Sequence, residues 1–127
     1  MALDDKGRML HGRLEFFDHN VTQLTKHMSG IVGHHRDGVN QGMKFSAQVK
    51  NVAAQEPFAD LQDRLVALSE ITERIALERK GIMCDRAEIE VLKKLEEIKD
   101  RVIGPTKALL RDRDNCVKSL IKAEHKM

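Results

Sequence analysis

The chain has 127 residues, a formal net charge of +2 and a sequence pI near 8.6. It is therefore one domain or part of one, and so small a positive charge does not by itself indicate nucleic-acid binding. Charged residues make up 33% of the sequence, aromatic residues 3%, and there are only two prolines, which favours long helices and disfavours a β-fold. A hydrophobic content of 41% argues against wholesale disorder.

The first long helix is predicted over residues 9–52. Its apolar residues recur at alternating steps of three and four, which places them on one side of a helix. They are Leu14, Phe17, Val21, Leu24, Met28, Ile31, Phe45, Val49 and Val52. A helix over this stretch would be roughly 60 Å long, so we expect an elongated, coiled-coil-like molecule in which the stripe packs on a second long helix, from this chain or from another copy.

The middle of that helix is expected to be weak. Four glycines, Gly30, Gly33, Gly38 and Gly42, each cost about 1 kcal/mol relative to alanine, and the polar segment 34–37 interrupts the apolar stripe. This predicts a bend or a loosened segment. The alternative is that Gly38 and Gly42 allow another helix to approach closely.

A chain reversal is predicted at residues 53–57, because the fixed φ of Pro57 suits a first helical turn. An antiparallel second helix follows over residues 58–127, with a kink at Gly104-Pro105. Its apolar stripe runs through Leu61, Leu65, Leu68, Ile71, Ile75, Ile82, Ile89, Leu92, Leu95, Ile98 and Val102. The helical pattern reaches Met127 without a Gly or Asn cap, so we expect at least one further helix in the complete fold.

Helix-packing or dimer contacts are assigned to ten of these apolar residues. They are Leu14, Phe17, Val21, Leu24, Met28, Ile31, Leu61, Leu65, Leu68 and Ile75. An intramolecular hairpin and a domain-swapped dimer bury the same stripes, so both arrangements stay open.

Basic residues gather beyond the kink. From Lys99 onward there are eight Lys or Arg and four Asp or Glu. Five basic residues fall within about 100° on a helical wheel and are candidates for contacts with anionic lipids, each contributing about 1 kcal/mol. They are Lys107, Arg111, Lys118, Lys122 and Lys126. The alternative interpretation is a solvated helix flank.

No residue pattern predicts catalysis, a cofactor or a metal site. His27, His34 and His35 have no carboxylate or cysteine at ligand spacing, and Gly30 to Gly33 does not follow a strand as a nucleotide-binding loop would. Cys84 and Cys116 lack zinc or redox spacing, so we expect free thiols in a reducing compartment. With neither a signal peptide nor an apolar run of about 20 residues, the protein is expected to be cytoplasmic.

Two short segments resemble the BAR-domain superfamily. The segment from Leu95 to Lys107 resembles its pattern of a hydrophobic pair, one residue, proline, any residue and lysine. The segment from Val21 to His27 resembles the start of helix one in the ciliary BAR-domain-containing proteins. The resemblance covers the first two helices of a domain that forms antiparallel dimers of three-helix protomers. It implies that Lys107, Arg111, Lys118 and Lys122 contact lipid.

The leading hypothesis is a non-catalytic, BAR-like scaffold, peripheral to membranes. It would dimerise, or pair with a related helical partner, and would bind or sense curved anionic membranes, with the ciliary base or basal body as a candidate location. The alternative is a coiled-coil or spectrin-like adaptor of the cytoskeleton or axoneme that binds proteins through the same stripes. The two hypotheses differ in whether the basic residues or an exposed apolar groove carries the function.

Overall fold

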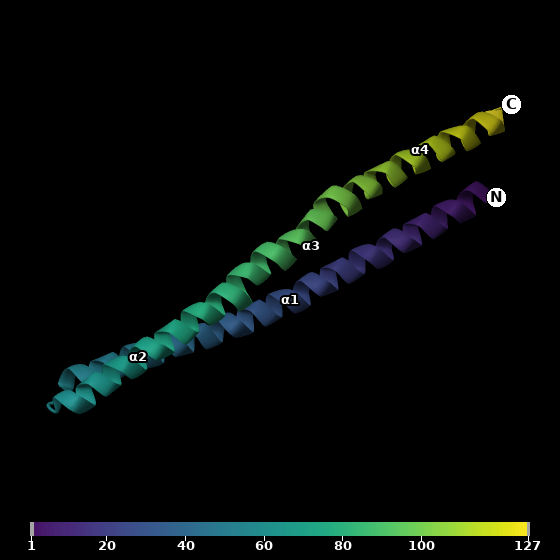
Figure 1. The fold of residues 1–127 in the computed structure, drawn as a ribbon. Helices are drawn as coiled ribbons and strands as arrows, with labels where there is room; N and C mark the ends of the chain where they lie inside the picture. Colours follow the sequence, from purple (N-terminus) through teal and green to yellow (C-terminus); the bar gives the residue numbers. More distant parts are fainter. Residues whose placement is uncertain (1, 127) are drawn as a thin grey trace. The chain divides into compact units, whose positions relative to one another are not determined.

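The computed structural model describes residues 2–126, and side chains are described for residues 5–126. Every element in this part of the chain is helical, which confirms the all-α prediction (Figure 1). In chain order they are the α-helix α1 (Ala2–Gln55), the α-helix α2 (Ala59–Arg79), the π-helical turns η1 (Lys80–Asp85) and η2 (Glu88–Leu92), the α-helix α3 (Lys93–Ile98), the π-helical turn η3 (Lys99–Ile103) and the α-helix α4 (Gly104–Lys126).

The chain divides into two compact units, each of which pairs part of α1 with a later segment. The turn unit comprises residues 27–92, and the terminal unit comprises residues 1–26 together with residues 93–127. Figure 1 shows α2 lying beside the C-terminal part of α1 within the turn unit.

The reversal between α1 and α2 is short and capped by side chains. The helix α1 extends past Val52 to Gln55, and Phe58 rather than Pro57 is the N-cap residue of α2, with φ −89° and ψ 115°. The Gln62 side-chain amide donates to the Ala53 carbonyl at 3.0 Å, which satisfies an acceptor at the end of α1. Pro57 therefore precedes α2 and does not occupy its first turn.

Within the turn unit, α1 and α2 meet through small side chains. Four buried positions of α1 recur every seven residues, with Val49 buried as well, and two of α2 have the same spacing, which is the repeat of a coiled coil. They are Val32, Val39, Ser46 and Ala53 on α1, and Ser69 and Ala76 on α2. We call this set of residues the small-residue seam.

The glycine-rich middle of α1 stays α-helical, and two of its glycines allow close approach. A Cβ atom on Gly42 would lie 3.2 Å from the Ala76 Cβ, and a side chain at position 38 would overlap the Arg79 guanidinium. Arg79 Nε donates to His35 Nδ1 at 3.1 Å beside this point. Of the two alternatives drawn from the sequence, the structure therefore shows close helix approach, not a loosened segment.

The second segment comprises the helical elements after the reversal, residues 59–126. Each π-helical turn inserts one extra residue into its seven-residue repeat of buried positions. Across η1 the buried position moves from Ala76 to Cys84, eight residues on, so Cys84 is 0% exposed while its neighbour Met83 is 39% exposed. Cys84 thereby lies in the same buried cluster as Val32 and Val39. The π turns decide which of two adjacent residues faces α1.

The π turn η3 acts in the same way in the terminal unit. It makes Ile103 buried, with 3% exposure, and leaves Val102 57% exposed. The N–H of Gly104 donates to the carbonyl of Lys99, five residues earlier. Pro105 follows immediately and has no N–H to continue the α-helical pattern. In place of the kink expected at Gly104-Pro105, the helical path continues from this π turn directly into α4.

Candidate functional site

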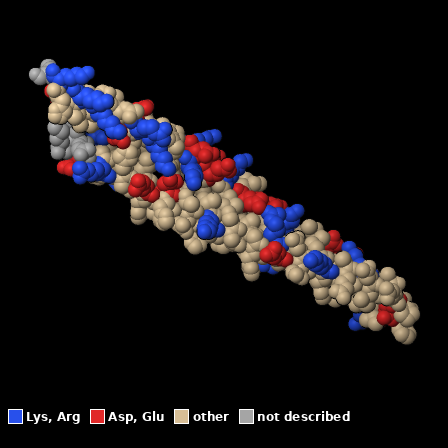
Figure 2. All heavy atoms as spheres, turned by 180° about the vertical axis from the view of Figure 1, so that it is seen from behind, with Lys and Arg blue, Asp and Glu red and all other residues tan. Residues whose placement is uncertain are grey.

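All five predicted lipid-binding residues are exposed on α4. Arg111, Lys118, Lys122 and Lys126 all lie on the solvated side of this helix, and their spacing keeps them on neighbouring faces. Figure 2 shows Lys and Arg side chains gathered over the terminal unit, with fewer Asp and Glu between them. Phosphate groups could therefore reach these cations without a rearrangement of the helix.

Lys107 has a different environment, because its ammonium group forms an ion pair with Asp18 of α1. This hydrogen bond holds the pKa of the Asp18 carboxyl below its usual value, burial opposes the shift, and the charges of Lys107 and Lys99 add to the lowering. The second carboxylate oxygen, Oδ1, is buried and has no hydrogen-bond partner among the described residues. Lys107 therefore joins two helices within the terminal unit and is a weaker candidate for lipid contact than the other four.

Lys118 lies at the edge of a small polar cleft of about 270 Å³. Across it, His11 Nε2 and Asp114 Oδ2 are 2.7 Å apart. The guanidinium of Arg113 covers Gly7, where an added Cβ would come within 2.6 Å of it. Ion pairs and hydrogen bonds thus hold the outer part of this helix pair and orient α4.

The ten residues assigned to helix packing divide into two groups. Val21 is buried, and Leu14, Met28 and Leu65 are half-buried, so these four pack within the chain. The other six are 42–59% exposed within this chain, and their assignment to dimer contacts stays a prediction: Phe17, Leu24, Ile31, Leu61, Leu68 and Ile75. They lie one residue before a buried or half-buried column, and the in-chain contacts pass through that column.

The exposed apolar residues form a second column on each segment of the turn unit. On α1 they are Ile31, Phe45 and Val52, and on α2 they are Leu61, Leu68 and Ile75. Phe45 and Ile75 line one groove of about 210 Å³ beside Gly42 and Ala76, so the two columns meet on one side of the helix pair. We call this surface the apolar face.

The residues that the sequence interpretation missed are the small ones. Ser46 Oγ donates to the Ser69 carbonyl at 2.7 Å, and both serines are almost fully buried. Large apolar residues dominated the predicted pattern, although the spacing of Val32, Val39, Ser46 and Ala53 is equally regular. A search for small residues seven apart would have found this seam.

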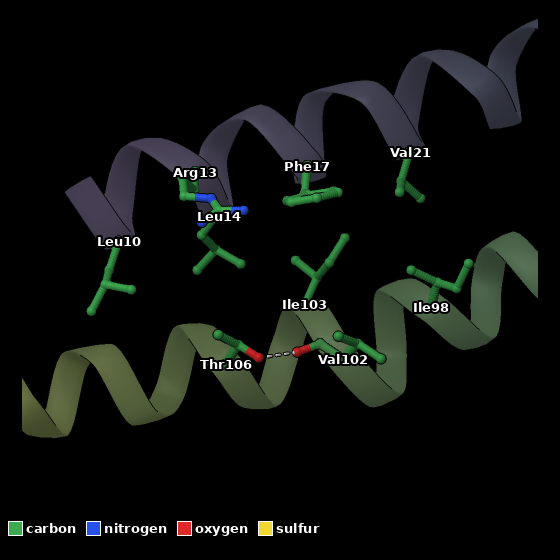
Figure 3. Close-up of a pocket in the computed structure, with 9 residues that line it drawn as sticks. All are labelled: Leu10, Arg13, Leu14, Phe17, Val21, Ile98, Val102, Ile103 and Thr106. Carbon is green, nitrogen blue, oxygen red and sulfur yellow. Dashed lines mark hydrogen bonds between the residues drawn. The ribbon is translucent and has the colours of Figure 1, made fainter. Parts of the chain in front are cut away.

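An apolar cleft of about 380 Å³ lies in the terminal unit, between α1 and the segment around η3. Its lining residues, which define the terminal cleft, are Leu10, Arg13, Leu14, Phe17, Val21, Ile98, Val102, Ile103 and Thr106. Figure 3 shows the apolar side chains of α1 projecting toward the facing segment, with Ile98 and Ile103 projecting back. The Thr106 hydroxyl donates to the Val102 carbonyl. Arg13 carries the one charged group among these lining residues.

Other chemistry-bearing side chains do not assemble into a site within the described residues. His, Cys, Asp and Glu form no group of three placed to hold a metal in residues 2–126. Cys84 is buried and Cys116 exposed, and both are free thiols. None of the described helices is sufficiently long and apolar to cross a bilayer.

No family model, curated protein or solved structure matches this chain.

Proposed function

We propose that this protein is a non-catalytic scaffold that binds anionic membrane surfaces through α4. The observation that carries the proposal is the exposure of Arg111, Lys118, Lys122 and Lys126 along one helix. Each basic residue held near an anionic leaflet contributes about 1 kcal/mol. Four of them support salt-sensitive binding, and a dimer that presents two such helices would bind more strongly by avidity.

The proposal includes an antiparallel, BAR-like hairpin that dimerises through the apolar face. The second column of apolar residues has no partner among the described residues, although columns of this kind normally pack against another helix. A second copy would cover Leu61, Leu68 and Ile75 with matching apolar residues, because an isologous interface is self-complementary. Curvature sensing and a location at the ciliary base belong to this proposal through the BAR resemblance alone.

Co-sedimentation with phosphatidylserine vesicles over a salt series tests the membrane function. Replacing Arg111, Lys118, Lys122 and Lys126 by Glu should abolish binding at low salt while helicity is retained. Binding of the native protein should weaken steeply with salt, because screening acts on exposed charges. Lys107 is left intact so that its ion pair with Asp18 survives.

The matched control reverses four exposed cations of the turn unit, Lys44, Arg64, Arg74 and Lys80, which gives the same change in net charge. This variant should retain most of the vesicle binding. Equal losses in both variants would show that total charge alone governs attraction. Vesicle binding that survives the α4 substitutions would contradict the proposed membrane surface.

The apolar face also supports a second candidate function, a helical adaptor that binds proteins. An exposed apolar groove is the feature that such an adaptor requires, and Phe45 and Ile75 line one. Sedimentation equilibrium of the Leu68→Gln, Ile75→Gln double variant separates the candidates. A native dimer that becomes a monomer supports self-association, whereas a native monomer without vesicle binding supports the adaptor.

A further inference from the structure

We propose that the terminal cleft holds the acyl chain of an anionic membrane phospholipid. This inference deepens the proposed membrane function and rests on it for the source of the lipid. The cleft volume of about 380 Å³ falls in the range of roughly 300–1,000 Å³ that is usual for small-molecule sites.

The lining chemistry favours a long apolar group that ends in one anion. Leu14, Phe17 and Ile103 provide aliphatic and aromatic walls, which gain free energy when a hydrocarbon replaces water. Arg13 is the charged residue of the lining, and it is exposed and makes no ion pair or hydrogen bond with any residue that the structure describes. Its guanidinium can therefore donate two parallel hydrogen bonds to the oxygens of a phosphate.

The surroundings of the cleft add positive charge. Lys99 Nζ donates to the hydroxyl of Thr22 at 3.4 Å, next to the lining residue Val21, and its charge also acts on the Asp18 carboxylate. Lys107 is neutralised by Asp18. A phospholipid supplies a phosphate for Arg13 beside its hydrocarbon chain, which matches one charged group in an otherwise apolar lining.

Photo-crosslinking with tail-labelled lipid tests the inference. Vesicles of phosphatidylserine and phosphatidylcholine carry a trace of phosphatidylserine with a diazirine at the end of one acyl chain, and crosslinked peptides are identified by mass spectrometry. Crosslinks should concentrate in segments 10–21 and 98–106. A matched probe with the diazirine on the headgroup should label α4 and the neighbourhood of Arg13 instead.

Two variants obstruct the cleft, and two neighbours serve as controls. Val102→Trp fills it and Phe17→Gln makes its wall polar, while Leu109→Trp and Phe16→Gln change exposed residues outside the lining. Tail crosslinking per sedimented protein should fall about tenfold in the first pair, the loss expected when about two methylene groups are left unburied. It should stay unchanged in the control pair.

A second arm separates this inference from the membrane function. Monomeric lysophosphatidic acid, kept below its micelle concentration, should shift the methyl NMR signals of Leu14 and Ile103 even if vesicles do not bind. Vesicle binding without tail crosslinks in these segments would overturn the inference, as would the absence of both vesicle binding and methyl shifts. A change of oligomeric mass in Val102→Trp would instead identify the cleft as a protein interface and would also overturn it.

Discussion

In the turn unit the paired helices meet through valine, serine, alanine and cysteine, whereas in the terminal unit the buried residues include the larger Ile103 and Leu110. The first arrangement is represented by the hydrogen bond from Ser46 to the Ser69 carbonyl. The second is represented by buried Ile103 and Leu110 and by the pair of Lys107 with Asp18. Small side chains let two helix backbones approach closely, and large ones keep them apart.

The size of the side chains between the paired helices determines which apolar surface each unit leaves exposed. Where the backbones are close, the large apolar side chains cannot enter the interface, so they form the apolar face of the turn unit. Where the backbones are held apart, a cleft of about 380 Å³ remains between them. One chain thus offers a grooved apolar surface in one unit and a lined cleft in the other.

The largest effect is expected for Leu110→Ala in the terminal unit, because packing there depends on bulk. Leu110 is 7% exposed, and truncating a buried leucine costs about 2–3 kcal/mol at a site that can partly collapse. Leu109→Ala is the matched control, since Leu109 is 69% exposed. Native-state hydrogen exchange of the α4 amides measures both changes, and equal costs for the two variants would contradict this packing.

In the turn unit the opposite change should be harmful, because Gly42 and Ala76 are already in close contact. Ala76→Leu inserts a large side chain opposite Gly42, where even a Cβ atom on the glycine would come within 3.2 Å of the Ala76 Cβ. Overpacking of this kind costs about 1–3 kcal/mol. Urea unfolding should show that cost for Ala76→Leu and little change for Ala67→Leu on the exposed side of α2. A neutral Ala76→Leu would mean that the helices are not close there.

The sequence was sufficient to predict long helices, because the three-four spacing and the lack of proline before Pro57 leave few alternatives. It was also sufficient to place the exposed cations of α4. It did not reveal which side of each helix faces the other within a unit, since hydrophobicity alone ranks Leu68 above Ser69 as a buried residue. In the structure Ser69 is fully buried and Leu68 is exposed.

The π-helical turns were beyond the reach of periodicity. A heptad counted through Ile75, Ile82 and Ile89 assumes an uninterrupted α-helix, but η1 and η2 each shift the buried column by one residue. Only η3 has a visible cause in the sequence, the missing N–H of Pro105. The terminal cleft could not be predicted either, because it depends on how far apart the two segments lie.

A smaller effect is expected from the buried hydroxyl of the small-residue seam. Ser46→Ala removes the hydrogen bond to the Ser69 carbonyl and should destabilise the turn unit by about 1 kcal/mol. Ser29→Ala is the control, because Ser29 is exposed on the same helix and experiences the same change in helix propensity. If both variants are equally stable in urea, the hydrogen bond contributes nothing and close packing alone holds the seam.

The smallest effect concerns the ion pair of the terminal unit. Asp18→Asn removes the carboxylate that Lys107 binds, and the pair is partly solvated, so the loss at neutral pH is expected to be slight. The melting temperature of the native protein and of this variant should be followed from pH 6 to pH 2. Asp112→Asn, at an exposed position on α4, is the control.

The direction of the pH dependence follows from the lowered pKa of Asp18. A carboxyl whose pKa is lower in the folded state than in the unfolded chain stabilises the fold fully above about pH 4, and this contribution is lost as the pH falls through the folded-state value. The difference between native protein and Asp18→Asn should therefore be constant near neutral pH and should shrink on acidification. A difference that does not shrink on acidification would mean that Asp18 acts through the shape of its side chain and not through its charge.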